Sequence, residues 1–215
     1  MEYTLDMSMM LAMHDALRRE LVQVARLAGQ RGDHPGRLLR AAVGWELFKK
    51  FLLVHHQCED DVLWPDLRAR VAGRPERLAL VDALEAEHAG IDPLLTAIDA
   101  AAADPDYGYQ RFGDIVDELV TTLTAHLAHE ERDGLALIDA SLPEPRWQHF
   151  AQVHGERLRG DVALYLPWLL NEASPQTVAA VAGKFPPPLL AAYREEWGPK
   201  YAAMNVWSPA ASPAA

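Results

Sequence analysis

Two short stretches place histidine beside acidic residues inside segments that otherwise have the pattern of buried helix. Residues 54–65 read VHHQCEDDVLWP, and residues 125–137 read AHLAHEERDGLAL. In each, a glutamate follows a histidine by four residues (His55/Glu59 and His126/Glu130), which places both side chains on one face of a helix. Imidazole combined with carboxylate is a ligand mixture that suits iron. The two stretches therefore predict a metal site.

Two more histidines lie at core-facing positions of other predicted helices. His14 and His88 each fall between apolar residues at helical spacing. Two buried glutamates without compensating charge would cost several kcal/mol each, and a bound metal supplies that charge. Four nitrogens and two carboxylates are more than one tetrahedral zinc can use, so the set predicts two metal ions.

A metal-free bundle with incidental histidines is the simplest alternative. It predicts that leucine at His55 and His126 would stabilise the fold. The neighbouring residues of both stretches are predicted to include several surface residues, as in most charged runs, or to support the ligands from outside: His56, Asp60, Asp61, His129, Glu131, Arg132 and Asp133.

The apolar spacing predicts four helices that position these residues. They cover about residues 5–29, 39–65, 77–101 and 110–141, with Pro65 expected to end or kink the second and Pro93 to bend the third. No stretch alternates apolar and polar residues as a strand would. The predicted fold class is all-α, an antiparallel four-helix bundle, whose core is a usual place for cofactors.

The composition changes after residue 142. Residues 143–215 contain ten of the 15 prolines and four of the six tryptophans. This indicates a bundle over residues 1–142, a helical C-terminal extension over 143–208 that packs on the bundle, and a disordered tail over 209–215. The extension is predicted to be a structural cap, with a surface for a protein partner as the alternative.

Charge and composition exclude several classes of protein. The net charge of −11, from 31 acidic against 20 basic residues, disfavours nucleic acid and anionic membranes as partners. The acidic N-terminus and the lack of a long apolar run predict a soluble, cytoplasmic protein. The single Cys58 excludes an internal disulfide.

These motifs together resemble the hemerythrin-like, or HHE-domain, family. The pattern HHxxEDxxLWP at residues 55–65 is similar to the family's HHxxEExxLFP, and HxxxEE recurs at 126–131, over a likeness of roughly residues 5–142. The resemblance implies a non-haem di-iron centre with two irons joined by an oxo or hydroxo group. It implies that Glu59 and Glu130 bridge the irons and that His14, His55, His88 and His126 are terminal ligands.

The chain departs from the oxygen carriers of that family, which have a second histidine on the third helix where this chain has Leu84. Two histidines on each iron would leave each with an open position, which favours breakdown of hydrogen peroxide or nitric oxide chemistry over reversible binding of O2. Candidates for a further ligand are Glu85, His56, His129 and Tyr107. A ferritin-like site is disfavoured because Glu85 to His88 is the one ExxH on a core-facing stretch.

The predicted function is therefore a di-iron protein that binds O2, hydrogen peroxide or nitric oxide, with possible catalase-like turnover. No catalytic residue separate from the metal ligands is identified, since the sequence has no hydrolase or nucleotide-binding motif. The alternative is a non-catalytic sensor of oxygen or iron that signals through the C-terminal extension.

Overall fold

The protein is a bundle of long helices with a helical extension across one side. The structure, a computed structural model, describes residues 3–30, 35–104 and 109–208, and contains no strand in these ranges. The predicted all-α class is confirmed, as is the helical extension. The four arms of the bundle are α1 (Ser8–Ala28), α3 (Val43–Cys58) with α4 (Trp64–Val71), α5 (Pro75–Ala103), and α6 (Tyr109–His129) with α7 (Leu135–Ser141).

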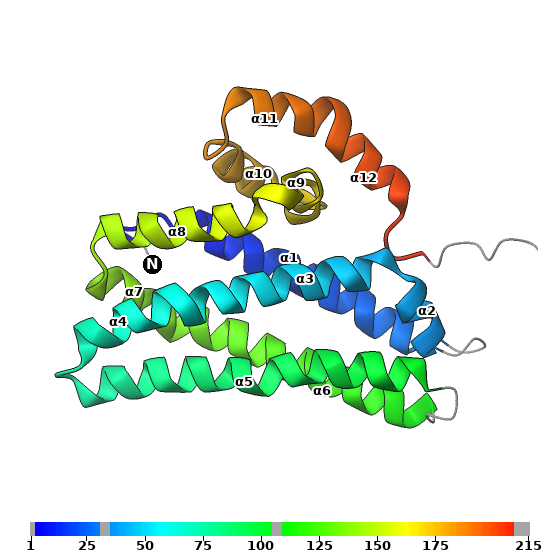
Figure 1. Cartoon of the computed structure of the whole chain (residues 1–215), viewed down its shortest axis with the longest axis horizontal. Coiled ribbons are helices and arrows are strands. Elements are labelled where there is room, and N and C mark those ends of the chain that lie inside the picture. Colours follow the sequence, from blue (N-terminus) through cyan, green and yellow to red (C-terminus); the bar gives the residue numbers. More distant parts are fainter. Residues whose placement is uncertain (1–2, 31–34, 105–108, 209–215) are drawn as a thin grey trace, which may run out of the picture.

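Each arm of the bundle packs against at least two others. Contacts join α1 to α3, α3 to α5, α5 to α6, and α6 back to α1. Figure 1 shows α5 and α6 side by side along one edge of the molecule, with α3 and α1 above them. This closed arrangement makes one interior into which all four arms can direct side chains.

The second predicted helix is broken in the structure. Leu39 lies on a separate helix, α2 (Pro35–Ala41), because the backbone of Ala42 is extended at φ −84° and ψ 116°. Neither Pro65 nor Pro93 ends a helix: Pro65 lies in the first turn of α4, and α5 continues through Pro93. Tyr107 and the predicted tail at 209–215 lie outside the described residues.

Both sequence motifs contain a turn of π-helix. The segments η1 (Glu59–Leu63) and η2 (Glu130–Gly134) join α3 to α4 and α6 to α7. The N–H of Trp64 donates to the carbonyl of Glu59, and the N–H of Leu135 donates to that of Glu130, five residues back. Such wide turns are frequent at functional sites.

The apolar core is divided into two clusters. One contains residues from the α2 end of the bundle, including Leu17, Phe48, Leu52, Ile91 and Leu127. The other contains residues from the α4 and α7 end, including Met10, Leu63, Trp64, Leu84 and Leu135. On every arm the predicted histidine or glutamate falls between residues of the two clusters. The polar residues therefore form a layer across the middle of the bundle.

The extension covers α1 and α3 (Figure 1). Its α8 packs on α3 and η1, while α9 and α10 pack on α1. Of its four tryptophans, Trp147, Trp168 and Trp207 are buried. Its helices are α8 (Glu144–Leu158), η3 (Arg159–Asp161), α9 (Val162–Leu170), α10 (Pro175–Ala182), α11 (Pro187–Ala192), η4 (Tyr193–Trp197) and α12 (Gly198–Met204).

Polar contacts fasten the extension to α1. Arg19 donates to the carbonyls of Trp168 and Leu169 at 3.3 and 2.9 Å. Trp207 lies against Gly44, where an added Cβ would come within 2.5 Å of the indole, and its Nε1 donates to Glu20 at 2.9 Å. Only glycine leaves room for this indole, so the extension is fitted to the bundle rather than loosely appended.

Within the described ranges, none of the helices combines the length and the apolar character that a membrane crossing requires.

The buried Glu20 predicts a pH-dependent contribution to stability. Burial raises the pKa of its carboxyl to about 7, with the bond from Trp207 acting in the opposite direction. The pKa of Glu20 is higher in the folded state than in the unfolded state. The free energy of unfolding is therefore unaffected by Glu20 ionisation below about pH 4.5 and falls as the pH rises from there through 7. Glu20→Gln keeps an acceptor for Trp207 without the charge. It should stabilise the protein at pH 8 by on the order of 3 kcal/mol, with no gain at pH 4.5.

Denaturant unfolding of both proteins across this pH range measures the difference directly. An equal effect of the substitution at both pH values would contradict the assignment.

Candidate metal centre

All six predicted site residues meet in the polar layer between the two apolar clusters. Each is at most 1% exposed, and so is His56. The contributing elements are α1 (His14), α3 (His55 and His56), η1 (Glu59), α5 (His88), α6 (His126) and η2 (Glu130).

The seven residues form two groups of potential ligand atoms, each within 4.8 Å of one another. The two-histidine group consists of His14, His55, Glu59 and Glu130, and the three-histidine group consists of His56, His88 and His126.

The two glutamates lie between the groups. Glu59 is 3.5 Å from His55 Nε2 through Oε1 and 3.5 Å from His88 Nε2 through Oε2. Oε2 of Glu130 is 3.3 Å from His14 Nε2 and 3.8 Å from His126 Nε2. Each carboxylate thus reaches histidines of both groups, which is the placement that a bridge between two metal ions requires.

Carboxylates on the outer side hold four of the five histidines. Because an ionised carboxylate only accepts hydrogen bonds, each of these Nδ1 atoms carries a proton, which leaves the inward-facing Nε2 as the atom that can bind a metal ion. The Nδ1 pairs are His14 with Glu131 (2.9 Å), His56 with Asp92 (2.8 Å), His88 with Asp60 (2.7 Å) and His126 with Glu87 (2.8 Å).

The inward atoms of this layer lack hydrogen-bond partners within the described part of the chain. They include Nε2 of His14, His55 and His56 and all four carboxylate oxygens of Glu59 and Glu130. Nε2 of His88 and Nε2 of His126 lie 3.2 Å apart, although neither carries a proton in the tautomer fixed by its Nδ1 contact. Buried polar atoms ordinarily have partners, so this donor set fits cations placed between its atoms.

Without metal, the buried carboxylates of the layer are compensated by protons, as the pKa shifts of Glu59 and His14 indicate. Burial raises the pKa of Glu59 well above its ordinary value, and the neighbouring Glu130 raises it further. Burial lowers the pKa of His14, but Glu130 and Glu131 outweigh that effect and raise it to about 9. Protons on Glu59 and His14 therefore occupy a place that metal would take, and metal binding should release them.

His56, one of the neighbours expected to include several surface residues and also a candidate further ligand, lies in the core. His56 is fully buried, its ring stacks on that of His88 at 3.9 Å, and it joins the three-histidine group. The reason is that α3 packs on α1, α5 and α8. With neighbours on three sides, two adjacent residues can both face the interior. The predicted even division of histidines therefore differs from the structure, which has three against two.

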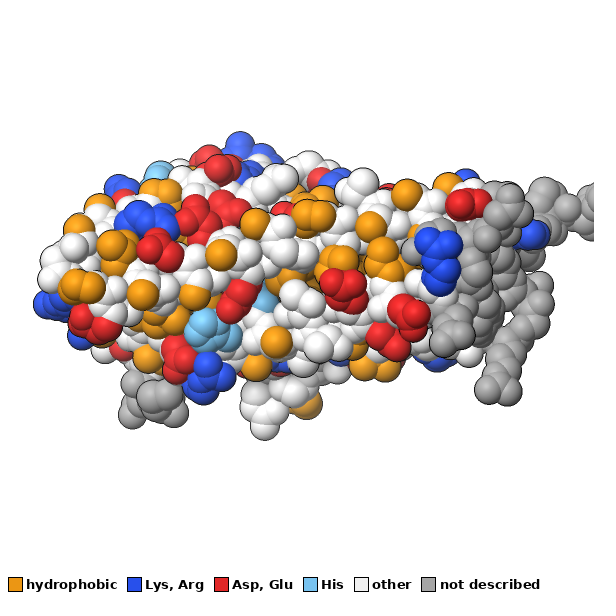
Figure 2. All heavy atoms as spheres, turned by 90° about the horizontal axis from the view of Figure 1, so that it is seen from below, with side chains coloured by type: hydrophobic (Ala, Val, Ile, Leu, Met, Phe, Trp, Pro, Cys, Tyr) orange, Lys and Arg blue, Asp and Glu red, His pale blue; other side chains and the backbone are white. Residues whose placement is uncertain are grey.

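Two of the other candidate ligands, Glu85 and His129, lie outside the layer. Glu85 is 42% exposed and pairs with Arg68 at 2.6 Å. His129 is 22% exposed and binds Glu87 at 2.7 Å through Nδ1. Figure 2 shows histidine and acidic side chains next to one another at the surface on the side of α5 and α6.

Sequence reasoning missed the outer carboxylates Glu87 and Asp92. It left open whether Asp60 and Glu131 face the surface or support the ligands, and the structure shows that both are partly buried and contact ligand histidines. The available signal was the acidic doublets, since each of these two residues directly follows a core-facing glutamate.

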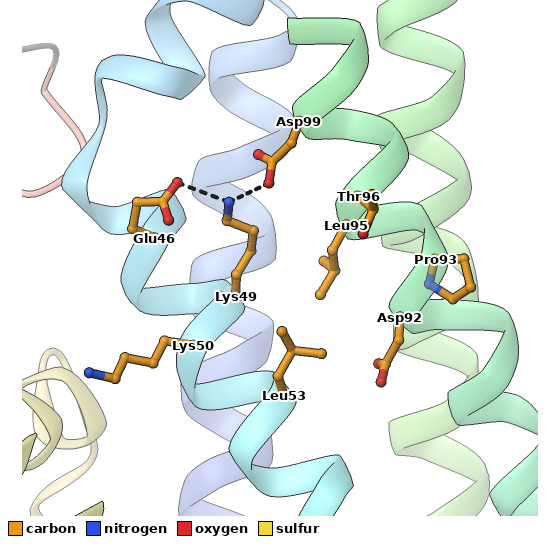
Figure 3. A pocket seen from close by; sticks show the side chains of 9 residues that line it. All are labelled: Glu46, Lys49, Lys50, Leu53, Asp92, Pro93, Leu95, Thr96 and Asp99. Carbon is orange, nitrogen blue, oxygen red and sulfur yellow. Dashed lines mark hydrogen bonds and ion pairs between the residues drawn. The ribbon is translucent and has the colours of Figure 1, made fainter. Parts of the chain in front are cut away.

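A groove of about 530 Å³ runs between α3 and α5 beside this layer. Its lining includes Asp92 at one end and the Lys49 pairs with Glu46 and Asp99 at the other (Figure 3). None of the seven layer residues lines it, but Asp92 binds His56. The groove therefore brings solvent to a residue that positions a histidine of the layer.

Comparison with known proteins gives an independent result for this region. Residues 6–138 match the family described as hemerythrin HHE cation binding domain, a stretch that contains all seven layer residues. No curated protein and no solved structure matches the chain. The match covers more than half of the chain, which therefore belongs to the hemerythrin HHE cation-binding domain family.

Proposed function

We propose that this protein holds two iron ions in the polar layer and binds O2 at one of them. His14 and His55 would hold one ion, His56, His88 and His126 the other, and Glu59 and Glu130 would bridge them. The observation that carries the proposal is the set of buried, partnerless ligand atoms whose histidines are fixed from behind by carboxylates.

The uneven division of histidines supports binding at a single ion. Three ring nitrogens belong to one group and two to the other, so the His14/His55 ion keeps a position for an external ligand. The hypothesis of peroxide breakdown or nitric oxide chemistry relied on an open position at both ions. His56 removes that support, which makes reversible O2 binding the better reading.

The surroundings of the two-histidine group suit such a ligand. When bound, the iron pair would supply the coordination position and the change of oxidation state that O2 binding uses. Met13 directly precedes His14, Phe51 lies one helical turn before His55, and both are at most 2% exposed. They exclude water from the layer.

Sensing through the extension is a second candidate. It is supported by the packing of α8 on α3 and η1, which carry His55, His56 and Glu59. A change at these residues on ligand binding would act directly on the extension.

Removal of metal should weaken the fold. Iron bound at about a thousand times its Kd contributes about 4 kcal/mol to the folded state, which corresponds to a fall in Tm of roughly 10 °C on removal. Iron analysis of the purified protein should give two ions per chain. Calorimetry before and after treatment with a chelator tests the stability. A metal-free protein with unchanged Tm after iron addition would contradict the proposal.

His56→Leu should reduce the iron content and remove the asymmetry of the pair, because His56 is one of the three nitrogens of its group. His149→Leu is the control, since His149 is an exposed histidine on α8 outside the layer. Iron analysis and the visible spectrum compare the two. Equal iron content and spectra in both variants would show that His56 is not a ligand.

Glu131→Gln should lower iron affinity by about 10- to 100-fold, as is typical when a partner of a ligand histidine is lost. Glu131 binds Nδ1 of His14 and is itself held by Arg18 at 2.7 and 3.0 Å. Asp133→Asn serves as control in the same segment, because Asp133 pairs with the exposed Arg132. Competition with a coloured chelator measures both, and a similar affinity for both variants would refute the positioning role.

A further inference from the structure

We propose that His154, on α8 of the extension and outside the family domain, donates the hydrogen bond to a small anionic ligand held at the two-histidine group. The proposal rests on the proposed function, because the ligand would occupy the open position of that ion. It assigns to the extension a part of the ligand pocket itself.

His154 lies beside the two-histidine group. Its ring is perpendicular to that of His55, with centroids 6.1 Å apart. Its other ring neighbours are Phe150 and Tyr165 of the extension, each at 6.2 Å. The contact with His55 places His154 beside the two-histidine group, because His55 belongs to that group and His56 to the three-histidine group.

Nε2 of His154 is a buried polar atom that lacks a hydrogen-bond partner among the described residues. The hydroxyl of Tyr165, whose ring neighbours that of His154, donates to the sulfur of Met13 at 3.8 Å. Phe51 packs edge-on against Tyr165 at 5.1 Å. A ligand beside His55 would supply the partner that Nε2 lacks.

A histidine ring carries an N–H whether it is neutral or protonated, so His154 is able to donate a hydrogen bond to a bound anion.

Azide is the probe for this inference, because it is a small anion that reports on its surroundings by its absorption and its stretching vibration. The iron-loaded full chain is titrated with azide, and the stretching band of the bound azide is recorded in H2O and in D2O. His154→Phe keeps an aromatic ring between Phe150 and Tyr165 but removes the N–H, and His154→Gln restores a donor. His149→Leu is the control, since His149 is an exposed histidine of the same helix.

The proposal predicts that His154→Phe weakens azide binding by about tenfold, the effect of one hydrogen bond, and abolishes the D2O shift. His154→Gln should recover most of the affinity, and His149→Leu should match the parent. A parent-like affinity and D2O shift in His154→Phe would overturn the inference and leave the proposed function intact.

Two further outcomes also decide the matter. Loss of iron from both His154 variants would overturn the inference, because it would make His154 part of metal retention. A parent protein that holds two irons but binds no azide would overturn the proposed ligand position, and the inference with it.

Discussion

A layer of ionisable side chains across the middle of an apolar bundle is the constraint on which this structure depends. Carboxylates and imidazoles buried at this depth lose their hydration. Among the described residues, most of their inward atoms have no hydrogen-bond partner in its place. The layer can persist only with positive charge inside it, from protons or from metal. The two apolar clusters on either side are what hold such a layer together.

The rest of the bundle serves this layer from outside. Four carboxylates fix the histidine rings from behind, and Arg18 in turn fixes one of those carboxylates. The extension closes the side of α1 and α3 that a four-helix bundle would leave open to water. The extension, although it lies beyond the family domain, is thus packed on the bundle as part of one structure. Its Trp207 fits against Gly44, where only glycine leaves room for the indole.

The sequence allowed the all-helical class, the four arms and the convergence of six site residues to be predicted, because each follows from spacing on a single helix. His56 could not be predicted that way. Adjacent residues on one helix point in different directions. Both His55 and His56 are buried because α3 has neighbours on three sides, namely α1, α5 and α8. The contacts of the outer carboxylates Asp92 and Glu87 could not be predicted for a related reason. They bind His56 and His126, which lie on other helices. The break at Ala42 is marked only by Gly44 two residues later, and a single glycine also occurs inside helices.

The π turns have a consequence for how the chain can be aligned or redesigned. From His55 the buried positions follow at intervals of four, through Glu59, Leu63, Leu67 and Val71. On an uninterrupted α-helix each such step would rotate by roughly 40° from the last, so the series would leave the core. The extra residue within η1 absorbs that drift. Threading this stretch onto an ideal helix would turn the α4 end of the core toward solvent while leaving every residue type in place.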